Sequence, residues 1–439
     1  GAMNKNWGRG GAVEQGKDLL ILLLTCSAVW RAVGSQLMHP LHGALTQEMP
    51  QQESGQSDGT AGVEAVRPLR ITANLTGGTE PVRYGVQYDD QACGALFQQT
   101  ASLLAEAPSG AGAPETASRR QWEQALLSVP GICFDFQGTI PLPVLVGWLS
   151  GGETQLTASV RRMALTAEEG ALVLYFQDEE DGTYYRCLSG MGEEGHLIEI
   201  LSGLSGNGAF YAFESELYGG LDGDTLISAQ TFAPRVYTAA NPVTGGRGSL
   251  AGLMEELGLA ANPNSYYYAG SAHVGRSGDD TLRLFDGGTA VYESEEGSEH
   301  FRISAQGAEP TVFEAVEACR KLTAVLSARC GQARLFLSSV VQGDNGLEVS
   351  FEYSLNGSQV RLEGGSAARF LVQDGQITQF ALRFRSYGDS GSTSVVMPYL
   401  QAAAAMEAQG LEGEELLLIY TDSGGDTVSA SWAAADRTA

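Results

Sequence analysis

The second half of this sequence repeats one order of segments, a single helix followed by several short strands. The first helix is expected to begin at Ser249 and to end at Gly258, and the second is expected over 311–331. Short strands that follow one another pair as an antiparallel meander, and helices outside it pack on a sheet face. We therefore expect an α+β fold whose two C-terminal helix-plus-meander units, 249–310 and 311–439, form a pseudo-repeat.

The preceding segment, 67–248, has the same mixture of helix and strand patterns and is expected to form an N-terminal α+β domain. Ser118 is a suitable N-cap for a short helix over 119–128, because its hydroxyl can accept a bond from a free backbone amide. Apolar residues alternate in 131–136, which predicts a strand. The acidic segment 178–182 is expected to turn between the two strands of a hairpin.

A strongly apolar run, Leu19 to Trp30, precedes this body. Twelve residues suit the core of a cleaved signal peptide, since a membrane-spanning helix needs about 20. The run reaches that length at Met38 if Arg31 lies near the outer interface, where a charge costs less than at the bilayer centre. From the residues alone, cleavage of this apolar run and its retention in the membrane are equally well supported.

If the apolar run is retained, the first part of the chain divides into three segments. The segment beyond it is rich in Gln, Ser and Gly, which is typical of a flexible tether. The division is a cytoplasmic tail whose Gly1 and Ala2 resemble a tag remnant (1–18), a transmembrane anchor (19–38) and a flexible linker (39–66).

The charge of the chain argues against nucleic acid as a partner. Lys and Arg number 26 and Asp and Glu number 52, which gives a formal net charge of −26. Such a chain repels phosphates, and no basic patch with interleaved aromatic residues is present in the sequence.

Six cysteines are spread through the sequence without CxxC spacing, so the common zinc and redox signatures are absent. Five follow the apolar run, and an odd number cannot pair fully within one chain. Cys319 and Cys330 are expected on one helix, about 16 Å apart along its axis, which is beyond disulfide reach. We interpret the cysteines as small buried apolar residues.

The sequence contains no strong candidate for a catalytic or metal-binding site. "GDSGS", 388–392, resembles the nucleophile motif of trypsin-like proteases, but no histidine has the matching local context, and Asp389 and Ser390 are expected in a loop. The acidic runs 178–181 and 293–300 lack the ligand order of a calcium loop. We therefore predict no catalytic, cofactor-binding or metal-binding residue and no enzymatic activity.

Four stretches resemble the YycH/YycI-type regulatory proteins of Gram-positive bacteria, and YycH most of all. They are the anchor "LLILLLTCSAVW", the helix-strand-Pro segment "WEQALLSVPGICFDFQGTIPLPVL" (122–145), the segment "LMEELGLAANPNSYYY…DDTLRLFDGGTAVYES", and "LEVSFEYSLNGSQVRLEGGSAARFLVQDGQITQFALRFRSY" with "GEELLLIYTDSG" and Trp432. The likeness is one of pattern over most of 19–435. The short anchor, the cysteines and the Gly-rich linkers depart from it.

The resemblance implies a single membrane helix with a cytoplasmic N-terminus and an extracytoplasmic, non-enzymatic body. Members of this family associate with a membrane sensor histidine kinase that controls cell-wall metabolism, so the implied partners are such a kinase and a YycI-like companion. Close helix contact in lipid relies on small side chains. Thr25, Cys26, Ser27 and Ala28 are therefore the candidate contact residues on the anchor.

Two other functions compete with regulation by contact. One is a secreted or anchored binding module for a cell-wall or small-molecule ligand, which a large apolar or aromatic-lined cleft would favour. The other is a hydrolase that uses Ser390, which a nearby histidine base would favour.

Overall fold

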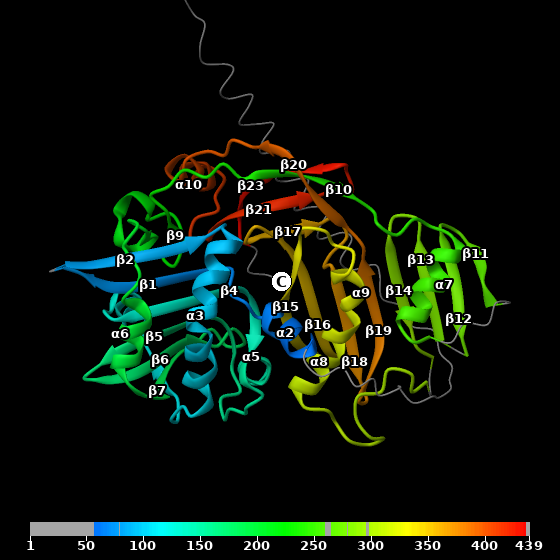
Figure 1. Ribbon diagram of the computed structural model, residues 1–439, viewed down its shortest axis with the longest axis horizontal. Coiled ribbons are helices and arrows are strands. Elements are labelled where there is room, and N and C mark those ends of the chain that lie inside the picture. Colours follow the sequence, from blue (N-terminus) through cyan, green and yellow to red (C-terminus); the bar gives the residue numbers. More distant parts are fainter. Residues whose placement is uncertain (1–56, 79, 260–264, 279, 296–297, 436–439) are drawn as a thin grey trace, which may run out of the picture.

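The computed structural model describes residues 57–435 except 79, 260–264, 279 and 296–297. In this part of the chain, a seven-stranded and an eleven-stranded sheet lie beside each other, with helices packed on them (Figure 1). Most neighbouring strands are antiparallel, and β17 and β21 form a parallel pair. The prediction of a mixed helix and antiparallel-sheet body is confirmed.

The seven-stranded sheet has the order β2-β1-β4-β5-β6-β7-β3. Its strands are β1 (Arg70–Gly77), β2 (Glu80–Gln87), β3 (Glu115–Ala117), β4 (Gly131–Pro141), β5 (Ser159–Glu168), β6 (Ala171–Gln177) and β7 (Tyr184–Glu193). Ile132 and Phe134 of β4 face one apolar layer and Cys133 faces another, because successive side chains alternate across a strand. Both faces of this sheet are therefore covered.

The two covers of this sheet come from different parts of the chain. One face packs against α3 (Asp90–Ser109), α5 (Leu142–Ser150) and α6 (Glu194–Leu201). The other packs against α4 (Arg119–Leu127) and the small sheet of β8 (Phe210–Tyr211) and β9 (Leu226–Ile227), with the turns η1 (Ala212–Glu214) and η2 (Glu216–Tyr218) beside it. Ser118 caps α4 as predicted, with Gln121 completing a reciprocal capping box.

The larger sheet runs from β11 at one edge to β23, in the order β11-β12-β13-β14-β19-β18-β16-β17-β21-β23, and β15 pairs with β16. Its strands are β11 (Tyr267–Ala269), β12 (Ala272–Ser277), β13 (Asp280–Phe285), β14 (Thr289–Glu293), β15 (Arg334–Gly343), β16 (Gly346–Leu355), β17 (Ser358–Leu362), β18 (Ala368–Gln373), β19 (Gln376–Arg383), β21 (Leu416–Asp422) and β23 (Ala430–Ala434). Through the β14–β19 pairing, the segments 249–310 and 311–439 share one sheet. Their pseudo-repeat stays a prediction.

Helices cover one face of this larger sheet (Figure 1). They are α7 (Arg247–Glu256), α8 (Val312–Leu322) and α9 (Ala324–Ser327), whose apolar residues belong to the same core as the sheet. A third sheet joins β10 (Arg235–Ala240), β20 (Ser386–Thr393) and β22 (Thr427–Val428), and α10 (Tyr399–Ala408) packs near β9 and η2. Gly258 ends the first repeat helix with a φ of 73°, as predicted, although that helix begins at Arg247 rather than after Ser249.

Three expectations from the sequence differ from the structure. The expected linker 39–66 ends in a helix, α2 (Ser57–Ala65), because Ala65 and Val66 are buried in the core. The expected helix 311–331 is divided at Thr323 into α8 and α9, and Cys330 lies beyond both. Asp389 and Ser390 lie on a strand, because β20 pairs with β10.

The predicted anchor, 19–38, and its four contact residues lie outside the described residues. In the part of the chain that the structure describes, no helix has both the length and the apolar content needed to cross a bilayer.

The two large sheets meet where β4 crosses β15. Gly138 of β4 comes so close that an added Cβ would lie 2.8 Å from the Cα of Ser338 and nearer still to the carbonyl oxygen of Leu337. A glycine is needed for this approach, since these neighbours are backbone atoms. The main apolar core is one cluster with residues from both sheets, and β4 is one of the strands that join the two halves.

Candidate functional site

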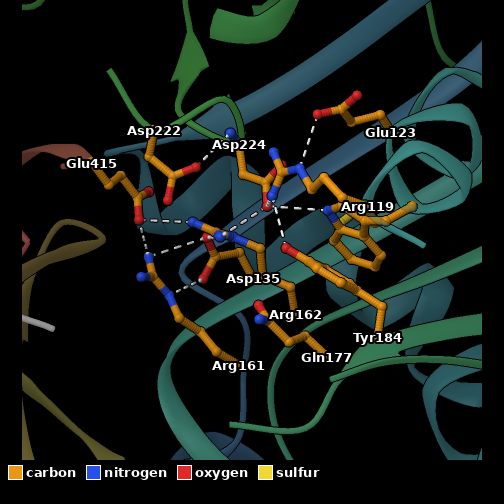
Figure 2. A network of polar contacts seen from close by, with 12 residues as sticks. Arg119, Glu123, Asp135, Arg161, Arg162, Gln177, Tyr184, Asp222, Asp224 and Glu415 are labelled. Carbon is orange, nitrogen blue, oxygen red and sulfur yellow. Dashed lines mark hydrogen bonds and ion pairs between the residues drawn. The ribbon is translucent and has the colours of Figure 1, made fainter. Parts of the chain in front are cut away.

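A cluster of buried charges is built around the carboxylates of Asp135, Asp224 and Glu415 (Figure 2). Glu415 directly precedes β21 and is 1% exposed. Its carboxylate contacts three arginines from the other sheet, at 2.8 Å from Arg70, 2.6 Å from Arg161 and 2.7 Å from Arg162. The segment before β21 is thereby tied to β1 and β5.

Asp135 is the second carboxylate of the cluster and lies on β4 between the two arginine-bearing strands. It lies 3.2 Å from Arg70 and 2.9 Å from Arg162, and it also pairs with Arg161 at 3.3 Å. The register between β4 and β5 shifts after Asp135, and Gln137 has a φ of 55°. Such a bulge bends a strand and redirects its side chains, which is consistent with adjacent arginines of β5 reaching the same carboxylates.

Asp224 extends the cluster toward α4. Its carboxylate accepts hydrogen bonds from Arg119 at 2.6 Å and from the indole nitrogen of Trp122 at 3.0 Å. Arg162 lies 3.4 Å away and connects this carboxylate to Glu415. Arg119 also donates to the Tyr184 hydroxyl at 2.8 Å. The cluster therefore couples the seven-stranded sheet, α4 and the C-terminal segment.

The neighbouring arginines keep both central carboxyl groups ionised. Burial alone would raise the pKa of Glu415, but attraction to Arg161, Arg162 and Arg70 lowers it from 4.5 to about 2. Burial likewise opposes the ionisation of Asp135, and the same arginines hold the pKa of Asp135 below its usual range. Neither carboxyl group is suited to proton transfer near neutral pH.

A cavity of about 10 Å³ lies beside the cluster, and Arg70, Thr72, Cys133 and Tyr211 are among its lining residues. The Nε and Nη2 atoms of Arg70 are buried and have no hydrogen-bond partner among the described residues. Such a volume holds one water molecule at most. Burial raises the pKa of the Cys133 thiol to about 12, so it is no nucleophile. The geometry suits rigid coupling between parts of the fold rather than ligand chemistry.

The motifs singled out in the sequence do not join this cluster. The hydroxyl of Ser390 donates to the carbonyl of Val236 at 2.6 Å and lies 2.8 Å from that of Ser392, while Asp389 pairs with Arg235. These contacts belong to strand pairing. The acidic turn at 178–182 is confirmed, with Asp178 and Asp181 accepting backbone amides of the turn.

The described residues contain no group of three or more His, Cys, Asp or Glu side chains that could hold a metal ion. Thr25, Cys26, Ser27 and Ala28 lie outside them, so the predicted contact patch stays a prediction.

Sequence reasoning missed every member of the buried cluster, although two signals were present. Asp135 interrupts the apolar strand "GICFDF", and the pair Arg161-Arg162 stands at the start of another strand with a buried face. A charge inside a buried strand requires a partner. The sequence does not identify Glu415 as that partner, since it lies 345 residues beyond Arg70.

Comparison with known proteins supports one similarity. No protein-family model matches this chain, and no curated protein sequence matches it. Among solved structures, the crystal structure of YycH from Bacillus subtilis superposes with a TM-score of 0.53 at 12% sequence identity, over 84% of this chain and 94% of that one. At this identity the likeness shows the fold alone. The predicted resemblance to YycH is confirmed at the level of the fold.

Proposed function

We propose that this chain, which has the YycH-type fold, is a non-enzymatic regulator of a membrane sensor histidine kinase that controls cell-wall metabolism. The body is extracytoplasmic, and the segment 19–38 holds it at the cell membrane with the N-terminus in the cytoplasm. The observation that carries this proposal is the likeness to YycH over 84% of the chain.

Regulation by contact requires a surface and a rigid frame rather than a reactive group. A sensor kinase exchanges between states, and a partner shifts that exchange only if it binds one state better than the other. The Glu415 cluster supports this role, because it fixes the C-terminal segment to the N-terminal sheet through buried and partly buried ion pairs. In a rigid body, the difference in binding free energy between two kinase states acts on the kinase. A flexible body would lose part of that difference in its own rearrangement.

The anchor supplies a second contact. Thr25, Cys26, Ser27 and Ala28 are small, and small side chains allow membrane helices to approach closely. We place the contact with the kinase helix, and with a YycI-like companion, on this patch. The native mature N-terminus tests retention. Chains in the membrane fraction should keep residues 19–38, and chains that begin only near Ser35 would contradict it.

A kinase-dependent transcriptional reporter tests the regulatory role. Deletion of the gene should shift reporter output, and re-expression of the full chain should restore it. A version with the Thr25–Ala28 patch replaced by leucines should restore it less. An unchanged reporter in the deletion strain would contradict the proposal, whatever the state of the anchor.

A further inference from the structure

The sequence contains three Asn-Gly pairs, and the structure describes all of them: Asn207-Gly208, Asn345-Gly346 and Asn356-Gly357. Asparagine is a chemically labile residue. It is most exposed to loss of its side-chain amide before glycine, which has no Cβ to keep its backbone nitrogen from the preceding side chain. Because the dipeptide is the same in the three places, the surroundings of each asparagine side chain decide which pair reacts in the folded chain.

Two of the three asparagine side chains are held by hydrogen bonds at both of their polar atoms. Asn207 Oδ1 accepts from the amide of Gly85 at 3.0 Å, and its Nδ2 donates to the carbonyl of the same residue at 2.7 Å. Asn356 Nδ2 donates to the carbonyl of Tyr88 at 2.9 Å, and its Oδ1 accepts from the amide of Asp90 at 3.3 Å. These bonds must break before either carboxamide can turn toward the nitrogen of the following glycine.

Asn345 is held differently. It lies with Asp344 in the turn of the β15–β16 hairpin, which closes with the pair Gly343 and Gly346. Asn345 is exposed, and no described residue forms a hydrogen bond with its side chain. Only its backbone carbonyl is bonded, by the side chain of Gln373. Of the three carboxamides, that of Asn345 is therefore the one that can turn without losing a bond within the chain.

We propose that Asn345 is a site of spontaneous covalent modification, at which the folded chain deamidates with water as the co-reactant. The backbone nitrogen of Gly346 attacks Cγ of Asn345 and gives up its proton. A new N–C bond forms, the Cγ–Nδ2 bond breaks, and ammonia leaves with that proton. Water then opens the five-membered imide. Cleavage at Cγ gives aspartate, and cleavage at the main-chain carbonyl carbon gives isoaspartate, so that one amide and one water become one carboxyl group and one ammonia.

The isoaspartate product changes the hairpin tip, because its main chain is one methylene longer. In the unmodified chain, the Gln373 side chain that donates to Asn345 also accepts from the hydroxyl of Thr378 at 2.9 Å. These contacts tie the tip of β15–β16 to the hairpin of β18 and β19. The longer main chain displaces the carbonyl from Gln373, and the new carboxylate lies beside the exposed Asp344. The modified tip should therefore open more often.

This inference does not depend on the kinase proposal. Peptide mapping by mass spectrometry tests it on the purified full chain, held at mildly alkaline pH and sampled over time. The amide at Asn345 should be lost at least tenfold faster than those at Asn207 and Asn356. In concentrated urea, where the side-chain bonds are absent, the three rates should converge. Equal rates in the folded chain, or a difference in urea as large as in the folded chain, would overturn the proposal.

Two variants at the same position separate the chemistry from its effect on the fold. Asn345→Gln would have to close a six-membered ring and should lose its amide at least tenfold more slowly than the unchanged chain. Asn345→Asp carries the added charge on a main chain of ordinary length. Amide hydrogen exchange over 341–346 should be faster in the aged, converted chain than in fresh Asn345→Asp. Equal exchange in these two samples would contradict the formation of isoaspartate at the tip.

Discussion

Arg70 Nη1 lies 2.8 Å from Glu415 Oε1, although 345 residues separate them in the chain, and both side chains are almost fully buried. A buried ion pair is favourable only when its attraction and hydrogen bonds offset the hydration that both charges have lost. Glu415 contacts three arginines, whereas the Nε and Nη2 atoms of Arg70 have no hydrogen-bond partner among the described residues. We infer that the contact fixes how the C-terminal segment sits on the N-terminal sheet.

The first prediction concerns the removal of the Glu415 charge. Glu415→Gln keeps the shape but leaves three arginines around a neutral amide, so the free energy of unfolding should fall by about 3–5 kcal/mol. Glu412→Gln, in the same loop but exposed, is the matched control and should change stability by less than about 0.5 kcal/mol. Urea unfolding measures both variants. Equal losses in the two would contradict the role given to Glu415.

The second prediction concerns the coupling between Arg70 and Glu415. In a double-mutant cycle with Arg70→Met and Glu415→Gln, the double variant should be more stable than the sum of the two losses by about 1–3 kcal/mol. The exposed pair Arg235 and Asp389 should give a coupling of about 0–1 kcal/mol in a parallel cycle. Additive losses of stability at Arg70 and Glu415 would show that the two side chains do not stabilise the fold through contact with each other.

The third prediction concerns acid. The folded-state pKa of Glu415 is depressed from 4.5 to about 2, so its contribution is fully present above about pH 4.5 and is lost as the pH falls toward 2. The stability difference between the unchanged chain and Glu415→Gln should therefore be constant from pH 7 to pH 5 and shrink below pH 4.5. Urea titrations at several pH values measure it. A stability difference that grows as the pH falls would contradict this prediction.

The fourth prediction concerns the contact between the two sheets. A Cβ at Gly138 would collide with the backbone of β15, so Gly138→Ala should destabilise the chain by about 1–3 kcal/mol. Gly252 in α7 has open space around an added Cβ, and Gly252→Ala should instead stabilise by about 0.5–1 kcal/mol. Thermal unfolding compares the two variants. A neutral Gly138→Ala would show that β4 and β15 can separate without cost.

Local signals in the sequence predicted the local parts of this fold. Ser118 caps α4 and Gly258 ends α7, because capping and left-handed glycine act within a few residues. The α+β class followed from the order of helices and strands. These features need no knowledge of distant partners.

Long-range pairing explains what the sequence did not predict. The strand that carries Ser390 forms because β20 pairs with β10, more than a hundred residues earlier, and a Gly- and Ser-rich segment carries no strand pattern of its own. The union of β14 with β19 depends on register between distant segments. The Glu415 cluster depends on three strands and a loop meeting in space, and no spacing in the sequence encodes it.

The central claim, regulation of a sensor kinase by contact, is tested most directly by the autophosphorylation rate of that kinase in membrane vesicles. Equimolar full chain should change the rate at least twofold relative to vesicles that hold an unrelated single-pass membrane protein at the same density. An identical rate with and without the chain, in vesicles where both proteins are inserted and folded, would contradict the claim.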